Sequence, residues 1–210
     1  DDTAPPEFLI GERSAKLGPA ASEGLTKFAR TNDLTVANVV QSLFLLLLAR
    51  LSGQNDITIG VTRSGRSHAD DVGRARIERA VGLYISTMPL RAHIELASPV
   101  GHWMRSIQNE FAQQDEFLHV GLQQVQRALG QTDLFDALFV FENYPVEGDV
   151  QDFAPGLQIA GIKGQDATHY GLALAAAMSP RGLVMRMTFD EATIASSQIK
   201  RVLSHLTQML

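Results

Sequence analysis

The sequence has no cysteine among its 210 residues. Without thiols the chain can form neither disulfides nor cysteine-based metal sites, and it cannot use a thiolate as a nucleophile. A chain without cysteine suits a compartment in which thiols are kept reduced. We therefore expect a cytoplasmic protein whose stability comes from an ordinary hydrophobic core.

The sequence also lacks an excess of positive charge. Its 18 lysines and arginines stand against 23 aspartates and glutamates, which gives a formal net charge of -5. Nucleic acids and anionic membranes select proteins with a cationic excess, so we expect neither as a partner. The strongest apolar run, LFLLLLARL from Leu43, is too short to cross a bilayer core of about 30 Å, and it predicts a buried helix.

Familiar catalytic signatures are missing as well. The chain has no GxGxxG, P-loop or GxSxG pattern. Its histidines are not paired four residues apart on any expected helix, so their spacing predicts no imidazole metal site. They stand at positions 68, 93, 102, 119, 169 and 205. We interpret each as a structural or surface residue and expect no bound metal.

The composition is that of a globular protein, with 45% hydrophobic and 20% charged residues. Residues 1–13 combine acidic side chains with Pro5 and Pro6, and we interpret them as an extended lead-in or linker segment. They lack the features of a signal peptide and do not begin with Met, so we expect an excerpt from a longer chain. The remaining residues, 14–210, suit one compact domain.

Hydrophobic periodicity predicts interleaved helices and strands. Helices are expected at 19–30, at 35–51, from Ser98 and Pro99 onward, at 120–129 and at the C-terminus. Strands are expected at DITIGVT, VGLYISTMPLR, FDALFVFE, GLQIAGI, YGLALAAAM and LVMRMTF. This order predicts an α/β fold in which a mixed β-sheet has helices packed on one face, as a two-layer sandwich.

The stretch VGLYISTMPLR, residues 81–91, carries two adjacent hydroxyls, Ser86 and Thr87, in an otherwise apolar strand. Successive side chains of a strand point to opposite faces, so only one of the two can face a given side of the sheet. The pair can line a channel through one hydroxyl, or both hydroxyls can satisfy backbone groups at a strand end.

Stretches along nearly the whole chain resemble one known family. They are DLTVANVVQSLFLLLLARLSGQNDITIGVTRSGR, VGLYISTMPLR, HVGLQQVQR from His119, and LFDALFVFENYPV at 134–146. Together and in this order they resemble the C-terminal half of the condensation domain of nonribosomal peptide synthetases, within the chloramphenicol acetyltransferase-like fold. The sequence departs from the family pattern at Tyr84, Ser86 and Met88, where the family more often has Phe, Asn and Leu.

The resemblance implies an acyltransferase that forms a peptide bond between two carrier-bound thioesters. The family's His-His-x-x-x-Asp-Gly motif is absent from these residues, so we expect no catalytic residue here and no activity of the 210 residues alone. The chain would form one wall of the substrate tunnel. Implied partners are the N-terminal lobe of the same domain, peptidyl carrier domains and an adjacent adenylation domain.

The resemblance also implies site residues. Expected tunnel residues are Arg66, Ser86, Thr87, Asn143 and Tyr144, with Ser86 favoured over Thr87 for the channel. Arg63 and Arg74 are candidates to face the phosphopantetheine arm of a carrier domain, because its phosphate favours basic residues. We expect no freely diffusing cofactor. A solvated charge run would also explain the arginines, and turn chemistry would explain Asn143.

Alternatives remain open within the fold and outside catalysis. An epimerisation or cyclisation relative, or an acyltransferase that uses coenzyme A, would share this lobe. A non-catalytic lobe that docks carrier proteins or a partner enzyme would share it too, because a fold does not determine a function.

Overall fold

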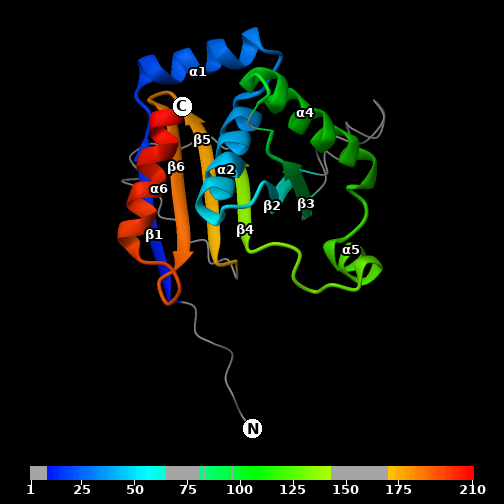
Figure 1. Ribbon diagram of the computed structural model, residues 1–210. Helices are drawn as coiled ribbons and strands as arrows, with labels where there is room; N and C mark the ends of the chain where they lie inside the picture. The colour runs from blue at the N-terminus through cyan, green and yellow to red at the C-terminus, as the bar shows by residue number, and fades with distance from the viewer. Residues whose placement is uncertain (1–8, 65–80, 83, 96, 143–169) are drawn as a thin grey trace, which may run out of the picture.

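The computed structural model describes residues 9–64, 81–82, 84–95, 97–142 and 170–210 (Figure 1). The predicted strand GLQIAGI lies outside these residues. The described residues form a six-stranded mixed sheet with its long helices on one side. The predicted fold class, a mixed sheet with helices on one face, is therefore confirmed.

The sheet has the strand order β1-β6-β5-β4-β2-β3. Its strands are β1 (Ile10–Lys16), β2 (Asp56–Ser64), β3 (Ile85–His93), β4 (Ala137–Glu142), β5 (Leu172–Ser179) and β6 (Gly182–Asp190). The central strands β2, β4 and β5 run parallel, while β1–β6, β6–β5 and β2–β3 pair antiparallel. Among the strands of the described residues, β1 and β3 are therefore the edges of the sheet.

Five α-helices and one short 3₁₀-helix complete the described chain. They are α1 (Pro19–Thr31), α2 (Val36–Ser52), α4 (Val100–Gln113), the 3₁₀-helix η2 (Gln114–Phe117), α5 (Leu122–Leu129) and α6 (Ser196–Met209). Figure 1 shows α2 and α6 in front of the sheet, α1 across one end and α4 on the side of β2 and β3. Of these described helices, α5 lies away from the layer.

Helix α2 is the centre of the core because its sequence is apolar nearly all round. Thr35 caps its first turn, accepting a hydrogen bond at Oγ1 from the Asn38 amide at 3.1 Å. Gly53 ends the helix in the left-handed conformation, φ 69°, which glycine adopts without steric cost. Phe44 then packs on Phe139 of β4, with ring centroids 6.4 Å apart. These contacts fix the helix layer on the sheet.

Two local predictions differ from the structure. Strand β1 begins at Ile10, inside the segment predicted as a lead-in, because residues 10–13 pair with β6. Helix α4 begins at Val100, and Ser98 does not cap it. Instead the Ser98 hydroxyl lies 3.3 Å from Nδ1 of His102, one turn into the helix.

No single described helix is long and apolar enough to cross a membrane. Helices α1 and α2 meet that criterion only as a pair, and the pair is bent by 97°.

Candidate functional site: the open face of the sheet

Alternation along the strands gives the sheet two unlike faces. The covered face packs against the helices through large apolar side chains, among them Ile59, Val61, Leu90, Phe139, Leu174, Met185, Met187 and Phe189. The described helices do not cover the opposite face, which we call the open face, although Leu138, Ala173 and Ala177 on it are buried. It carries mostly small or hydroxylated side chains. It comprises Thr58, Gly60, Thr62, Thr87, Pro89, Leu138, Val140, Glu142, Ala173, Ala175, Ala177, Val184, Arg186 and Thr188.

The two hydroxyls of β3 fall on different faces. Thr87 pairs directly with Thr62 of β2 on the open face, so two hydroxyls stand side by side there. Ser86 pairs with Arg63 and shares the covered face with Leu90. The register therefore places Thr87 on the open face and Ser86 on the covered face, and a tunnel role of either hydroxyl stays a prediction.

An aromatic pair lies on the open face beside β2, near the starts of β4 and β5. Gly60 presents no side chain there, and a Cβ atom at this position would collide with the ring of Phe135. Phe135 in turn packs on Tyr170, with ring centroids 5.2 Å apart. Partial burial raises the pKa of the Tyr170 phenol above its ordinary value, so the phenol stays neutral and can donate a hydrogen bond.

An ion pair crosses the open face near the end of β4. Nη2 of Arg186 lies 3.4 Å from Oε1 of Glu142, and the side chains are only 25% and 30% exposed. The two residues stand on β6 and β4 and reach over β5, whose facing residues are Ala175 and Ala177. Alanines on the middle strand leave room for this contact. The sequence motif LVMRMTF contains the signal, because Arg186 interrupts an apolar alternation.

Arg63 lies on the covered face, at the end of β2. Its guanidinium forms an ion pair with Asp115 of η2 and donates a hydrogen bond at 2.8 Å to the Phe111 carbonyl. The guanidinium carbon also lies 3.9 Å from the centroid of the Phe111 ring. Burial lowers the pKa of Arg63, and Asp115 opposes that shift. These contacts join the end of α4 to the sheet, and a contact of Arg63 with a carrier-borne phosphate stays a prediction.

The other predicted site residues lie outside the described part of the chain. They are Arg66, Arg74, Asn143 and Tyr144. Ser86 and Arg63 are brought together, on the covered face, whereas Thr87 lies on the open face. Sequence reasoning missed the open-face residues Thr62, Arg186 and Glu142.

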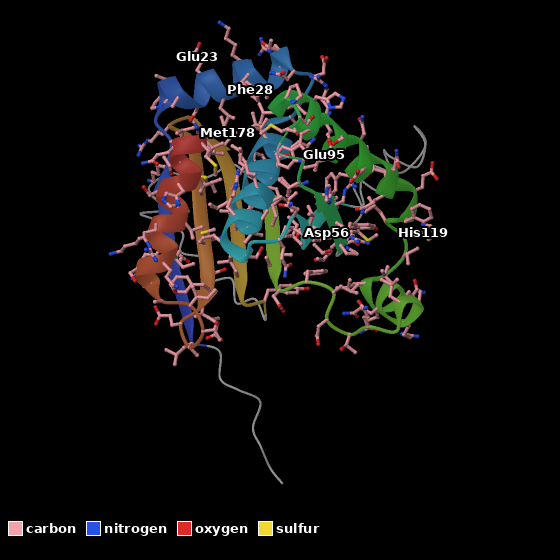
Figure 2. All side chains as sticks on the ribbon, in the orientation of Figure 1. Glu23, Phe28, Asp56, Glu95, His119 and Met178 are labelled. Carbon is pink, nitrogen blue, oxygen red and sulfur yellow. The ribbon has the colours of Figure 1, made fainter. Side chains whose placement is uncertain are left out.

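A wide, shallow pocket lies at the far end of β3. Its volume is about 650 Å³, and its lining includes Asn55, His93, Glu95 and Ser98. Thr87 is six residues along the strand from His93, a distance of about 20 Å. Figure 2 labels Asp56 and Glu95 at this end of the strands. Within the described residues no three acidic or histidine side chains gather closely enough to hold a metal ion.

The arrangement can bind and orient a ligand better than it can perform acid–base chemistry. The open face offers hydroxyls, an aromatic pair and an ion pair. A histidine of these strands, His93, stands exposed at the end of β3, beside the Asp56 carboxylate. A general base must lie within hydrogen-bond reach of the proton that it removes. Among the described residues, the centre of this face therefore lacks an imidazole within reach.

Comparison with known proteins identifies relatives over almost the whole chain. The family model described as "Condensation domain" matches residues 2–210. Chondramide synthase cmdD of Chondromyces crocatus is 37% identical over 181 residues, 85% of this chain and 4% of its own. A linear gramicidin synthase of Brevibacillus parabrevis is 31% identical over 202 residues, 95% of this chain and 2% of its own. The chain thus spans only a small part of these synthases.

Solved structures show the same fold at low sequence identity. The condensation domain from Monacolin K polyketide synthase MokA matches with a TM-score of 0.76 and 16% identity, over 99% of this chain and 50% of that chain. The complex of the X-domain and OxyB from teicoplanin biosynthesis matches with a TM-score of 0.76 and 15% identity, over 98% and 46%. The chain therefore spans about half the length of these solved chains.

Proposed function

Because the chain belongs to the condensation-domain family, we propose that it forms one wall of a tunnel in which a peptide bond is made. An acceptor amine attacks the carbonyl carbon of a donor acyl thioester, the C–N bond forms and the C–S bond breaks. The amine gives up a proton, and the departing thiolate takes one. The result is an amide on the acceptor carrier and a free thiol on the donor carrier.

The observation that carries this proposal is the open face of the sheet. The helices cover one face and leave the other to side chains such as Thr62, Thr87 and Ala175. A sheet normally buries an apolar face and leaves a polar one to water or to another layer. Since the chain spans about half the length of solved condensation domains, a second lobe facing this surface would enclose a channel between the two.

The proposed roles follow from the groups on that face. The hydroxyls of Thr62 and Thr87 orient an amide or thioester carbonyl by hydrogen bonds, and alanines leave space for an acyl chain. The imidazole that receives the amine proton comes from the other lobe, since histidine titrates near neutral pH. Both substrates arrive on phosphopantetheine arms of peptidyl carrier domains, one of them loaded by an adjacent adenylation domain.

A non-catalytic docking lobe is the second candidate. Its support is the similarity to an X-domain whose solved structure is a complex with OxyB. In that case the same surface would hold a partner enzyme or a carrier domain, and no bond would be made. Shape alone does not separate the two candidates, because the TM-scores of the two kinds of domain are alike at 0.76.

The test uses the intact domain that contains this chain, with donor-loaded and acceptor-loaded carrier proteins and detection of the product by mass spectrometry. Thr87→Val keeps the shape of the side chain and removes its hydroxyl. We expect kcat/KM to fall about tenfold, the equivalent of one hydrogen bond, with an unchanged melting temperature.

Ser86→Ala is the matched control, because Ser86 is the next residue and lies on the covered face. It should leave turnover within about twofold of wild type, since its hydroxyl does not reach the open face. No product from the wild-type domain, with binding of a partner retained, would establish the docking function instead. Equal losses for both variants would contradict the assignment of the two faces.

A further inference from the structure

Helix α5 has an apolar stripe that the described residues cover only in part, since Leu122 and Val125 are half-buried and Leu129 is exposed. Leu122, Val125 and Leu129 recur at helical spacing, so they share one side of the helix. No residue of α5 is buried, and Leu129 is 60% exposed. Phe117, just before the helix, is 55% exposed. An amphipathic helix normally forms because its apolar side is packed, so α5 lacks part of its packing partner among the described residues.

The segment of residues 114–135, which includes α5, runs from the covered side of the sheet to the open side. At its start, Nε2 of Gln114 donates a hydrogen bond of 3.0 Å to the Pro89 carbonyl, on the outer edge of β3. At its end, Phe135 packs on Gly60 of the open face. The segment therefore passes round the edge strand, and Figure 2 shows His119 on this path beyond the end of α4. This route places α5 at the rim of the open face.

The composition of this segment is that of an interface core. Residues 118–132 contain one charged side chain, Arg127, besides His119, and the polar residues between them are mainly glutamines. The cores of protein interfaces are depleted in charged residues and enriched in apolar ones. A helix side meant for water would instead carry lysine and glutamate.

We infer that the apolar stripe of α5, formed by Leu122, Val125 and Leu129, packs against the other lobe of the condensation domain. The occupant follows from length and position. The solved chains contain about as many residues again as this chain matches, 50% in one case and 46% in another. The stripe also adjoins the rim of the face on which we have placed the tunnel. This inference rests on the proposed function, in which two lobes enclose the tunnel. It goes further by naming α5 as a helix through which this lobe contacts the other.

Photo-crosslinking in the intact domain tests the inference. A benzophenone amino acid is introduced at Leu129, on the stripe, and in a second protein at Arg127, which is exposed on the opposite side of the helix. We expect at least about tenfold more adduct from position 129, because only a packed side chain lies within about 4–4.5 Å of a neighbour. Peptide mass spectrometry should assign the adduct to the other lobe of the same polypeptide.

Other assignments overturn the inference. They are adducts to a carrier domain, to a second copy of the chain or to residues 1–210 themselves, or equal yields at the two positions. Hydrogen exchange of wild-type protein checks the result without a substitution: the α5 amides should exchange slowly in the intact domain, and rapid exchange would also contradict it. If either test fails while the domain still forms peptide bonds, this inference is wrong and the proposed function is unaffected.

Discussion

The two faces of the sheet are built from the same strands but from different kinds of residue. On β6 the covered face has Met185 and Met187, fully buried, whereas the open face has Arg186 between them. On β4 the neighbours Phe139 and Val140 divide in the same way. Large apolar residues on one face provide the stability of the lobe. The open face contributes less to this stability, so small and polar residues can occupy its positions.

The largest expected loss of stability comes from a substitution on the covered face. Phe139→Ala removes a buried ring that packs on Phe44, and it should lower the free energy of unfolding of the intact domain by about 3–5 kcal/mol. Val140→Ala, at the next residue on the open face, should cost about 1 kcal/mol or less. Denaturant titration of both variants measures the difference. Similar losses would mean that both faces are core.

A second change overpacks the open face at Gly60. Gly60→Val places a branched side chain where the Phe135 ring lies, so we expect a loss of about 1–3 kcal/mol from overpacking. Shortening the ring in the double variant Gly60→Val, Phe135→Ala should recover part of that loss. Gly24→Ala is the control, because a Cβ there meets no atom and alanine in the interior of α1 should not lower stability. A neutral Gly60→Val would contradict the aromatic packing.

The two arginine ion pairs give a finer comparison. Arg63→Met removes contacts with Asp115 and Phe111 under the helix layer, so we expect a loss of about 1–2 kcal/mol. Arg186→Met removes a partly exposed pair with Glu142, and the loss should be about 1 kcal/mol or less. Thermal melting measures both. The reverse order would show that the open-face pair is the structural one.

Sequence reasoning could predict the elements and the layers but not the contacts between distant residues. Thr35, Gly53 and the run from Leu43 define α2 locally, and alternation defines the strands. The pairing of Arg186 with Glu142 depends on strand order, because β5 must come between them with alanines. The local sequence pattern of each strand does not reveal the order of the strands in the sheet.

The two hydroxyls of β3 show the same limit within a single strand. Alternation separates Ser86 from Thr87 without saying which of the two meets the helices. The register with β2 supplies that information, since it sets Ser86 opposite Arg63 and Thr87 opposite Thr62. A role of either hydroxyl in a tunnel stays a prediction.

The start of β1 illustrates a further limit. Adjacent prolines predict an extended chain through residue 13, but pairing with β6 decides that the sheet begins at Ile10, and that partner is far away in sequence. At α4, Ser98 and Pro99 form a familiar start signal. The structure instead uses the Ser98 hydroxyl toward His102. Such choices depend on neighbours that a short pattern does not include.

The smallest expected effect lies at the exposed end of β2. A hydrogen bond from Nε of Arg91, 2.9 Å from Oδ1 of Asp56, lowers the pKa of that carboxyl below its ordinary value. A lowered folded-state pKa adds stability above the unfolded pKa of about 3.9, and this is lost as pH falls through the folded value. Asp56→Asn should thus lower the melting temperature slightly at pH 7, and the difference should shrink as the pH is lowered toward 2. A constant difference across that range would rule out the ion pair as the cause.

The most direct measurement follows the donor itself. The intact domain is mixed with a carrier protein whose phosphopantetheine arm holds an acyl chain bearing a photoreactive diazirine, in a form that cannot be transferred. After irradiation, adducts should map to open-face residues such as Thr87, Val140 and Ala175. Adducts confined to helices α1, α2 and α6, on the covered side, would contradict the account, and so would labelling of the other lobe alone.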